Sequence, residues 1–560
     1  MMLPLPDTIS GSLDTPESIS YLHNMYNVGG ALVSREPMRL LVDDYTAAAG
    51  GGGLPTLTKI HNLSGRCRCL MVYGGNQILT VIGDAAYQYT TTTDLNPPND
   101  TVYFLFQLAG GLTIPGDGDI AWAEGYTGVA FATGTKKYFI DSSQNISELT
   151  DADLPDCMDV VYLGGRYVWL TADGESIFWS EVDDPGNVSA LYFFDAEARP
   201  DKNRALAVIG EDLFVFGEES IQRFRNIGGA SQPFINVSNS VIPIGYLGGM
   251  IKLSTKVLFL GRENGGAASF YEMSGSSINK ISPYVVDSLM VNQITLNGQS
   301  TLSDGVGTGG SSEASFFDVG VLRGQSFPVG GENVYTFTTD DFTLYAKQSG
   351  GGYQWGFLSS DINAEYSDND EWHSRPMGKA YDSVSDAGFH PTFEFQFATF
   401  FDRRWIFAGN MRNDDSFLGI FEKTKPLSTQ NFKDLSINTS TNASVERSIT
   451  RGLYLGLNDA AQRDTVFDSL EVSYSRRARG DYMTAVTGDS GDTLNMYLSL
   501  TGLSSTWSTA QTISYGDKDE SERLRFSFAG GLTPTNGSLQ LALETSAEIP
   551  FTITGLNANV

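Results

Sequence analysis

Histidine and cysteine are the first side chains to test for metal or acid–base chemistry. The chain has three cysteines, Cys67, Cys69 and Cys157, and four histidines. The histidines are His23, His61, His373 and His390. Only His61 has cysteines near it, at positions 67 and 69, whereas a zinc site normally needs four converging ligands. We therefore expect these side chains to pack in the ordinary way, and the sequence predicts no metal site.

Paired carboxylates are a second route to catalysis. Asp183, Asp184 and Glu197 lie close together in the sequence, and glycoside hydrolysis needs two carboxyl groups at a defined separation in a cleft. Closeness in sequence does not supply that separation, so a solvated acidic loop is the simpler interpretation. The sequence also contains no nucleophile elbow, no phosphate-binding loop and no His-Glu-x-x-His helix. We therefore expect no catalytic residues, no enzyme activity and no cofactor.

Composition narrows the class of protein further. The chain has 560 residues and a formal net charge of −30, which argues against tight binding to nucleic acid or to an anionic membrane. Three cysteines are too few for a disulfide scaffold. The first ten residues contain no basic residue, so they do not resemble a secretion signal. No apolar run approaches the roughly 18 residues of a membrane span. We expect a soluble protein that is made in the cytosol.

Short strands joined by tight turns recur along the chain. Turns near residues 164, 210 and 254 follow one another at intervals of 46 and 44 residues, and each joins two β-branched or aromatic segments. A period in the forties with three or four strands per unit is typical of a β-propeller blade. A β-sandwich is the alternative, but sandwiches do not show so steady a period. The sequence predicts an all-β fold and leaves the number of blades open between five and seven.

The predicted organisation has three parts. They are an N-terminal segment (1–50) that docks on the propeller or on a neighbouring ring, a β-propeller (51–445) with an irregular insertion at about 291–395, and a C-terminal antiparallel β domain (446–560). The boundary before the C-terminal domain rests on an Asn-, Thr- and Ser-rich stretch at 438–446, which reads as a linker.

Several short motifs resemble one known family. They are LPDCMDVVYLGGRYV at 154–168, AEARPD at 196–201, EDLFVFG at 211–217 and IPFTITG at 549–555. Their order resembles the tail-hub, or nozzle, proteins of short-tailed bacteriophages (podoviruses), also called packaged-DNA stabilisation proteins. The resemblance is good over residues 20–290, loose over 447–560 and weak between them.

The resemblance implies a structural protein of the virion tail that assembles in the host cytoplasm. It implies a β-propeller with added β domains, and a homo-hexameric ring below the portal and its adaptor ring. Such a ring extends the DNA channel, retains the packaged genome and conducts it during ejection. A tail fibre, spike or needle is the expected partner at the side or tip, and double-stranded DNA passes without sequence-specific binding. The alternative is a carbohydrate-binding or carbohydrate-cleaving propeller for receptor recognition, with Trp179, Trp355 and Trp372 as aromatic platforms.

Acidity offers a physical role within such a ring. Residues 101–200 hold 16 acidic and 4 basic residues. Carboxylates within about a Debye length, roughly 8 Å at physiological salt, repel phosphates and would let a duplex slide without sticking. The candidate lining residues are Asp151, Asp153, Asp156, Asp159, Asp183 and Asp184. The alternative for any one of them is that it merely keeps the outer surface soluble.

Overall fold

A computed structural model describes most of the chain as β-strands. With short breaks, the described residues are 2–40, 67–107, 112–290, 322–358, 397–457, 467–475, 493–499, 511–514, 522–545 and 552–559. Within them, one helical turn lies at 284–288. The all-β class predicted from the sequence is confirmed.

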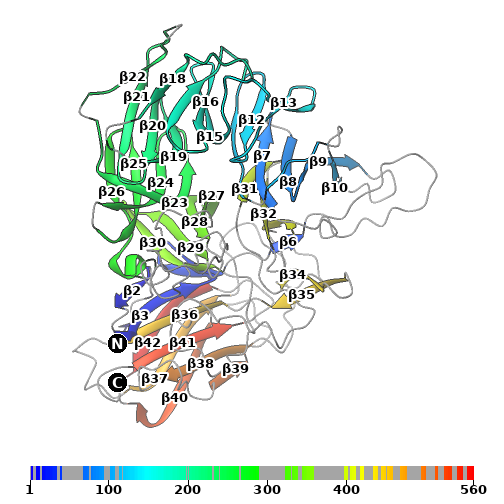
Figure 1. Ribbon diagram of the computed structural model, residues 1–560. Coiled ribbons are helices and arrows are strands. Elements are labelled where there is room, and N and C mark those ends of the chain that lie inside the picture. Colours follow the sequence, from blue (N-terminus) through cyan, green and yellow to red (C-terminus); the bar gives the residue numbers. More distant parts are fainter. Residues whose placement is uncertain are drawn as a thin grey trace, which may run out of the picture.

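Seven groups of four strands follow one another in the described residues (Figure 1). The first is β7 (Cys67–Tyr73), β8 (Gln77–Ile82), β9 (Ala85–Thr93) and β10 (Thr101–Gln107). The second is β11 (Ala121–Glu124), β12 (Gly128–Ala132), β13 (Lys137–Asp141) and β14 (Ile146–Glu148). The third is β15 (Cys157–Leu163), β16 (Arg166–Thr171), β17 (Ser176–Trp179) and β18 (Phe193–Asp195). The fourth is β19 (Asn203–Ile209), β20 (Asp212–Gly217), β21 (Ile221–Asn226) and β22 (Phe234–Asn236).

The remaining three groups complete the propeller. The fifth is β23 (Ile244–Lys252), β24 (Val257–Glu263), β25 (Ala268–Ser274) and β26 (Ser277–Lys280). The sixth is β27 (Arg323–Val329), β28 (Glu332–Thr338), β29 (Thr343–Ser349) and β30 (Gly352–Leu358). The seventh is β31 (Phe397–Phe401), β32 (Arg404–Asn410), β33 (Ser416–Phe421) and β6 (Met38–Leu40). We call these groups blades 1 to 7.

The blades form a closed ring. The first strands of successive blades contact one another from β7 through β31, and β31 in turn contacts β7. The fourth strand of blade 7 is β6, which precedes blade 1 in the chain and pairs antiparallel with β33. A strand from before the first blade therefore completes the last one, and this pairing holds the ring shut.

Short turns join the first two strands of blades 3, 4 and 5. In blade 3, Leu163 pairs with Arg166, so Gly164 and Gly165 form a two-residue hairpin loop. Their φ angles are 62° and 79°, the left-handed conformation at both positions that a type I′ turn needs and that glycine adopts without strain. The predicted turns near 164, 210 and 254 are confirmed as the first hairpins of blades 3, 4 and 5.

Each interface between successive blades has its own apolar core. Between blades 2 and 3, for example, Ala130, Leu154, Val160 and Trp169 are buried together. Comparable clusters join blades 1 and 2, 3 and 4, 4 and 5, 5 and 6, and 6 and 7. Burial against a neighbour is what stabilises a blade, because a single four-stranded sheet exposes both of its faces.

The N-terminal strands are shared between the propeller and the C-terminal strands. They are β1 (Met2–Leu3), β2 (Ser10–Ser12), β3 (Thr15–His23), β4 (Met25–Val28) and β5 (Ala31–Ser34). The C-terminal strands are β36 (Arg451–Leu457), β37 (Phe467–Ser475), β38 (Thr493–Ser499), β39 (Gln511–Ser514), β40 (Glu522–Leu532), β41 (Leu539–Thr545) and β42 (Thr552–Asn559). One sheet has the order β4-β5-β42-β37-β40, with β1 beside β42.

A second sheet joins the propeller to the C-terminal strands. Blade 6 continues from β30 through β3 into β36, β41, β38 and β39, and β3 runs parallel to β30. Side chains of blade 6 fix the N-terminal segment, since the Tyr345 hydroxyl donates to the Met25 carbonyl at 2.7 Å and Lys347 Nζ donates to the Asn27 carbonyl at 2.7 Å. The N-terminal segment therefore contributes strands to three sheets.

Two regions differ in detail from the sequence-based outline. The region at about 291–395, predicted as an irregular insertion, contains the four regular strands of blade 6, and its remaining parts lie outside the described residues. The expected linker at 438–446 overlaps a hairpin of β34 (Lys433–Asn438) and β35 (Ala443–Ser448). A polar composition is compatible with these strands, because strand pairing uses backbone groups and does not need apolar side chains.

Arg68 makes the first link between blades 1 and 2. It is fully buried on β7, and its guanidinium donates to the carbonyls of Gly118 and Ile114 at 2.8 Å, of Gly83 at 3.2 Å and of Pro115 at 3.4 Å. These carbonyls lie in the β8–β9 turn and in the segment that leads into blade 2.

We expect Arg68→Met to lower the free energy of unfolding by at least about 3 kcal/mol, because several buried carbonyls would lose their donor at about 1–3 kcal/mol each. Urea denaturation followed by tryptophan fluorescence measures this. The matched control is Arg225→Met, whose side chain is 52% exposed and pairs with Asp212; its cost should stay below about 1 kcal/mol. Equal costs for the two variants would contradict the role given to Arg68.

Candidate functional site

The six predicted acids lie in three places along β15, the innermost strand of blade 3. Asp151, Asp153 and Asp156 precede β15, Asp159 lies on it, and Asp183 and Asp184 lie beside the turn that follows it. The segment 184–190 packs between blades 2 and 3, where its Val188 is buried with Leu149 and Leu154 of the loop that joins the two blades.

Asp151 and Asp153 accept hydrogen bonds from the segment 184–190, at the end of blade 3 where β15 begins. The Asp151 carboxylate accepts hydrogen bonds from the Asp153 amide at 2.9 Å and the Val188 amide at 3.2 Å. The Asp153 carboxylate accepts one from the Ala190 amide at 3.2 Å. Both acids therefore hold this segment through its backbone amides.

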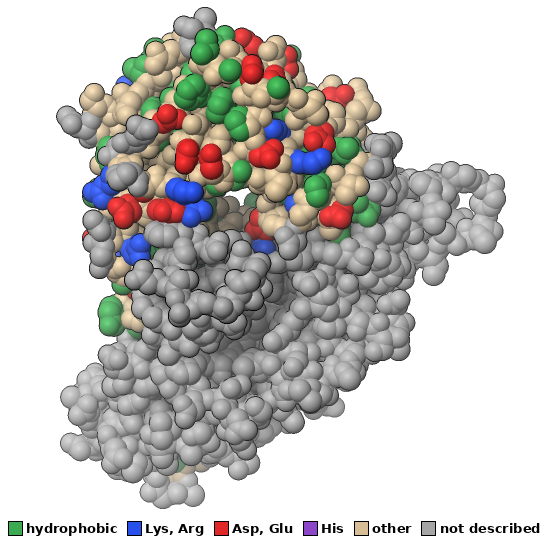
Figure 2. Space-filling model, in the orientation of Figure 1, with side chains coloured by type: hydrophobic (Ala, Val, Ile, Leu, Met, Phe, Trp, Pro, Cys, Tyr) green, Lys and Arg blue, Asp and Glu red, His purple; other side chains and the backbone are tan. Residues whose placement is uncertain are grey.

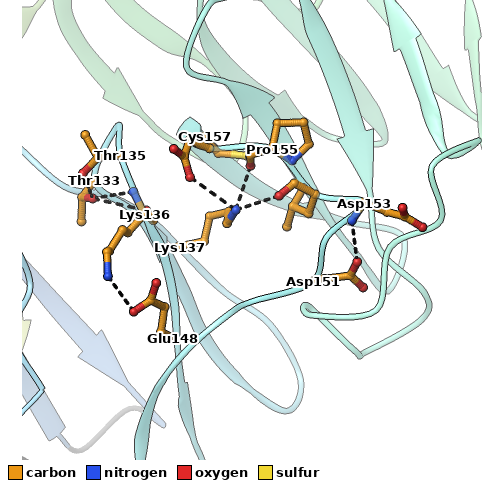
Figure 3. A network of polar contacts seen from close by, with 11 residues as sticks. Thr133, Thr135, Lys136, Lys137, Glu148, Asp151, Asp153, Pro155 and Cys157 are labelled. Carbon is orange, nitrogen blue, oxygen red and sulfur yellow. Dashed lines mark hydrogen bonds and ion pairs between the residues drawn. The ribbon is translucent and has the colours of Figure 1, made fainter.

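Lys137 holds the same loop from the side of blade 2 (Figure 3). Its ammonium group donates to the carbonyls of Leu154 at 2.7 Å and Pro155 at 3.0 Å, and it lies 3.6 Å from the Asp156 carboxylate. The neighbouring Lys136 pairs with Glu148 at 2.8 Å. Asp156 keeps 61% of its side chain exposed, so this pair is weak and the carboxylate still faces water.

Asp183 and Asp184 lie at the opposite end of β15, beside the Gly164–Gly165 turn. The Asp183 amide donates to the Gly165 carbonyl at 2.7 Å, and the hydroxyl of Tyr162 donates to its carboxylate. Asp183 has a φ of 55°, a left-handed conformation that aspartate tolerates better than most residues. Burial, together with this carboxylate, raises the pKa of Tyr162. Asp184 is exposed.

Asp159 connects three blades near the centre of the ring. Its buried carboxylate accepts hydrogen bonds from the Val160 amide at 2.8 Å and from the Leu206 amide of blade 4 at 2.7 Å. It also forms an ion pair with Lys252 of blade 5 at 3.1 Å. Because Asp159 is buried and fully engaged, its role in this chain is to join neighbouring blades.

A second ion pair crosses the ring and was missed by the sequence-based reasoning. Arg323 Nε of blade 6 donates to the Asp119 carboxylate, just before blade 2, at 2.6 Å. Blades 2 and 6 are not neighbours, so the pair must span the central axis. Nearby, Tyr246 is partly buried, and burial raises its pKa well above its usual range. Burial also raises the pKa of Cys67 to about 11. Solvent still reaches the two ion pairs, because the Asp119 and Lys252 side chains are 32% and 38% exposed.

The described residues offer no metal site and no exposed tryptophan platform among the predicted residues. No group of three or more His, Cys, Asp or Glu side chains in the described ranges is placed to hold a metal ion. No helix in the same ranges is long and apolar enough to cross a membrane. Trp179 and Trp355, named as sugar platforms, are 3% and 0% exposed, so that assignment is wrong for both. Trp372 lies outside the described residues.

A family comparison identifies the propeller. Residues 107–299 match the phage-stabilisation family, described as "Bacteriophage P22 Gp10, beta-propeller". The match spans blades 2 to 5 and about a third of the chain. It confirms the resemblance drawn from the sequence motifs, and it supports a structural protein of a phage tail that is associated with the virion. No curated protein matches the sequence.

Two solved structures show weak similarity. One is PorZ of Porphyromonas gingivalis, a bacterial surface component of the type-IX secretion system, with 12% identity and a TM-score of 0.29 over 62% of this chain and 42% of PorZ. This chain therefore spans less than half of that structure. The other is BamB from Moraxella catarrhalis, with 7% identity and a TM-score of 0.28 over 64% of this chain and 98% of BamB. At these scores neither bears on function.

We expect Asp159→Asn to lower the free energy of unfolding by about 3 kcal/mol. The amide group has one acceptor oxygen in place of two, so either the Val160 amide or the Leu206 amide loses its buried acceptor, and Lys252 loses its charged partner. Chemical denaturation measures the change. Asp184→Asn on the exposed turn of the same blade is the control, with an expected change below about 0.5 kcal/mol. If Asp159→Asn were as mild as its control, the three-blade link would not be stabilising.

Proposed function

We propose that this chain, whose residues 107–299 match the phage-stabilisation family, forms the ring-shaped hub, or nozzle, of a phage tail. In this role it extends the portal channel below the adaptor ring, retains packaged DNA and conducts it during ejection. The family match over blades 2 to 5 is the observation that carries the proposal. A homo-hexamer is the proposed assembly, with a fibre, spike or needle at the side or tip.

The proposed DNA path runs between copies of the chain and not through the propeller. The Asp119–Arg323 pair at 2.6 Å joins opposite sides of the ring, and the Asp159–Lys252 pair occupies the same central region. A duplex cannot pass an axis that two side chains bridge directly. A head-to-tail interface that closes by rotation produces a ring with a larger central bore, formed by one face of each copy.

Acidity suits a bore of this kind. Each copy carries a formal charge of −30, and surface carboxylates repel a duplex within about a Debye length. Asp153 and Asp156 are exposed, next to the first strand of blade 3, and they remain candidates for the lining. Asp159 is buried and Asp151 is engaged with backbone amides, so we leave both out of the proposed lining.

No catalytic role is part of the proposal. The receptor-binding alternative needed aromatic platforms for a sugar, and two of its three tryptophans are buried in blade cores. No observation in the described residues favours that alternative over the structural role.

The first test is the number of copies in the virion. We expect six copies of this chain per tail, arranged as a ring below the adaptor. Electron cryo-microscopy of whole particles gives the symmetry, and quantitative mass spectrometry against the portal protein gives the number independently. A tail containing three or twelve copies would refute the hexamer, whatever the function of the chain.

The second test is the charge of the bore. We expect the double variant Asp153→Lys with Asp156→Lys to slow DNA release from purified particles, most strongly at low salt, because lysines bind phosphates by releasing counterions. The matched variant, Asp153→Asn with Asp156→Asn, removes repulsion without adding attraction and should have a smaller effect. Release kinetics can be followed with a DNA-binding dye. Unchanged rates in the lysine variant at low salt would exclude these two residues from the bore.

A further inference from the structure

Three large apolar side chains are exposed on one face of the propeller. They are Tyr126 of blade 2, Val182 of blade 3 and Ile227 of blade 4, with exposed fractions of 88%, 56% and 54%. Each lies in or beside the turns at the ends of the first strands. Single exposed apolar residues are common on soluble proteins, whereas a continuous row marks a surface for interaction.

Contacts between the turns that carry these side chains place the three of them in one row. The hydroxyl of Thr127, next to Tyr126, donates to the Asp183 carbonyl at 2.9 Å, and Asp183 is the neighbour of Val182. A side chain at Gly165 would lie 3.3 Å from Val182 Cγ1. At Gly164, the next residue of the same turn, a side chain would overlap the Asn226 amide, and Ile227 follows directly. The row therefore crosses three consecutive blades. We call it the turn row.

The turn row is acidic as well as apolar. Glu124, Asp184 and Glu211 are exposed beside it, one on each of the three blades. The turns and loops that form the row, 124–127, 164–165, 180–187, 209–211 and 226–229, contain no lysine or arginine. Figure 2 shows one face of the described part of the propeller, where apolar, acidic and basic side chains are interspersed.

Acidic residues outnumber basic ones around the turn row. Residues 121–195 hold 13 acidic and 3 basic residues. The three basic residues are Lys136, Lys137 and Arg166, and each already forms an ion pair, with Glu148, Asp156 and Glu181 respectively. A partner that covers the turn row must therefore supply positive charge for the acidic side chains that it covers.

We propose that the turn row is the docking surface for a different protein of the particle, through a segment that carries apolar side chains flanked by Lys or Arg. Charge complementarity selects this occupant. DNA and anionic lipid would be repelled, and a second copy of this chain brings the same net charge of −30. The apolar residues provide the area that is buried on binding. The exposed acids beside them, Glu124, Asp184 and Glu211, orient the partner and increase its rate of association. The proposal depends on membership of the tail and not on a ring of six.

Photo-crosslinking in assembled particles tests the proposal. Tyr126→p-benzoylphenylalanine places a photoreactive group of similar shape in the turn row. The control is Tyr284→p-benzoylphenylalanine, at a tyrosine that is 69% exposed and begins the short helical turn. We expect position 126 to crosslink to another virion protein, at a segment containing lysine or arginine. An adduct with a second copy, an adduct with DNA or no adduct would overturn the proposal, and so would an equal yield of the same adduct from position 284.

Charge reversal gives an independent readout. Asp184→Lys with Glu211→Lys should lower the yield of the position-126 adduct about tenfold at low salt. The matched control, Glu175→Lys with Glu219→Lys, makes the same change of net charge on exposed turns at the opposite ends of blades 3 and 4, and should leave the yield unchanged. An equal loss in both pairs would show that only overall charge matters and would overturn the proposal. Hexamer symmetry in the control particles tests the ring separately.

Discussion

The structure depends on closure of the ring. A blade hides its two faces only against the next blade, so the first and last blades must also meet, or each would leave an apolar face in water. The chain satisfies this with β6, which lies before blade 1 and pairs with β33 of blade 7, and with the contact between β31 and β7. Because the closing partners are separated by more than 300 residues, the ring is complete only when the last blade has been made. The N-terminal strands then continue from blade 6 into the C-terminal sheets, so that closure also fixes the rest of the molecule.

Ion pairs inside the ring add a second set of long-range links. Asp119 with Arg323 joins blades 2 and 6, and Asp159 with Lys252 joins blades 3 and 5. Charged groups inside a protein are costly unless they are paired and hydrogen-bonded, and the backbone amide of Leu206 gives Asp159 a further partner. The inner surface of this propeller thus carries paired charges that link blades which are not neighbours. In the proposed assembly, the path for DNA is therefore formed by the arrangement of several copies and not by the fold of one chain.

Local patterns in the sequence predicted the turns and hairpins. They did not predict which strands or charged residues pair when these lie far apart in the sequence. The Gly164–Gly165 turn and the period of about 45 residues specified the hairpins of blades 3 to 5, because turn conformation and strand alternation are set by adjacent residues. The parallel pairing of β3 with β30, and the use of β6 in blade 7, leave no such local signal. The Asp119–Arg323 pair spans 204 positions, so neither residue stood out. The sequence showed that this region is rich in acids. It did not show which acids lie at which end of β15, because that depends on how the segment 184–190 packs between blades 2 and 3.

The acids of blades 2 and 3 therefore act at two levels. Asp151 and Asp159 accept hydrogen bonds from buried backbone amides, and their charge is used within the chain to hold loops and blades in place. The carboxylates of Asp153, Asp156 and Asp184 face water and contribute to the negative electrostatic potential around the protein. Asp153 and Asp156 lie before β15, whereas Asp184 lies beside the turn that follows it, so the free charge is presented on two surfaces facing different ways. A surface that repels DNA and a surface that attracts a basic protein need the same residue types, so in the proposed assembly the position of each surface would decide its role. The opposite ends of one blade would then allow both proposed roles without either interfering with the other.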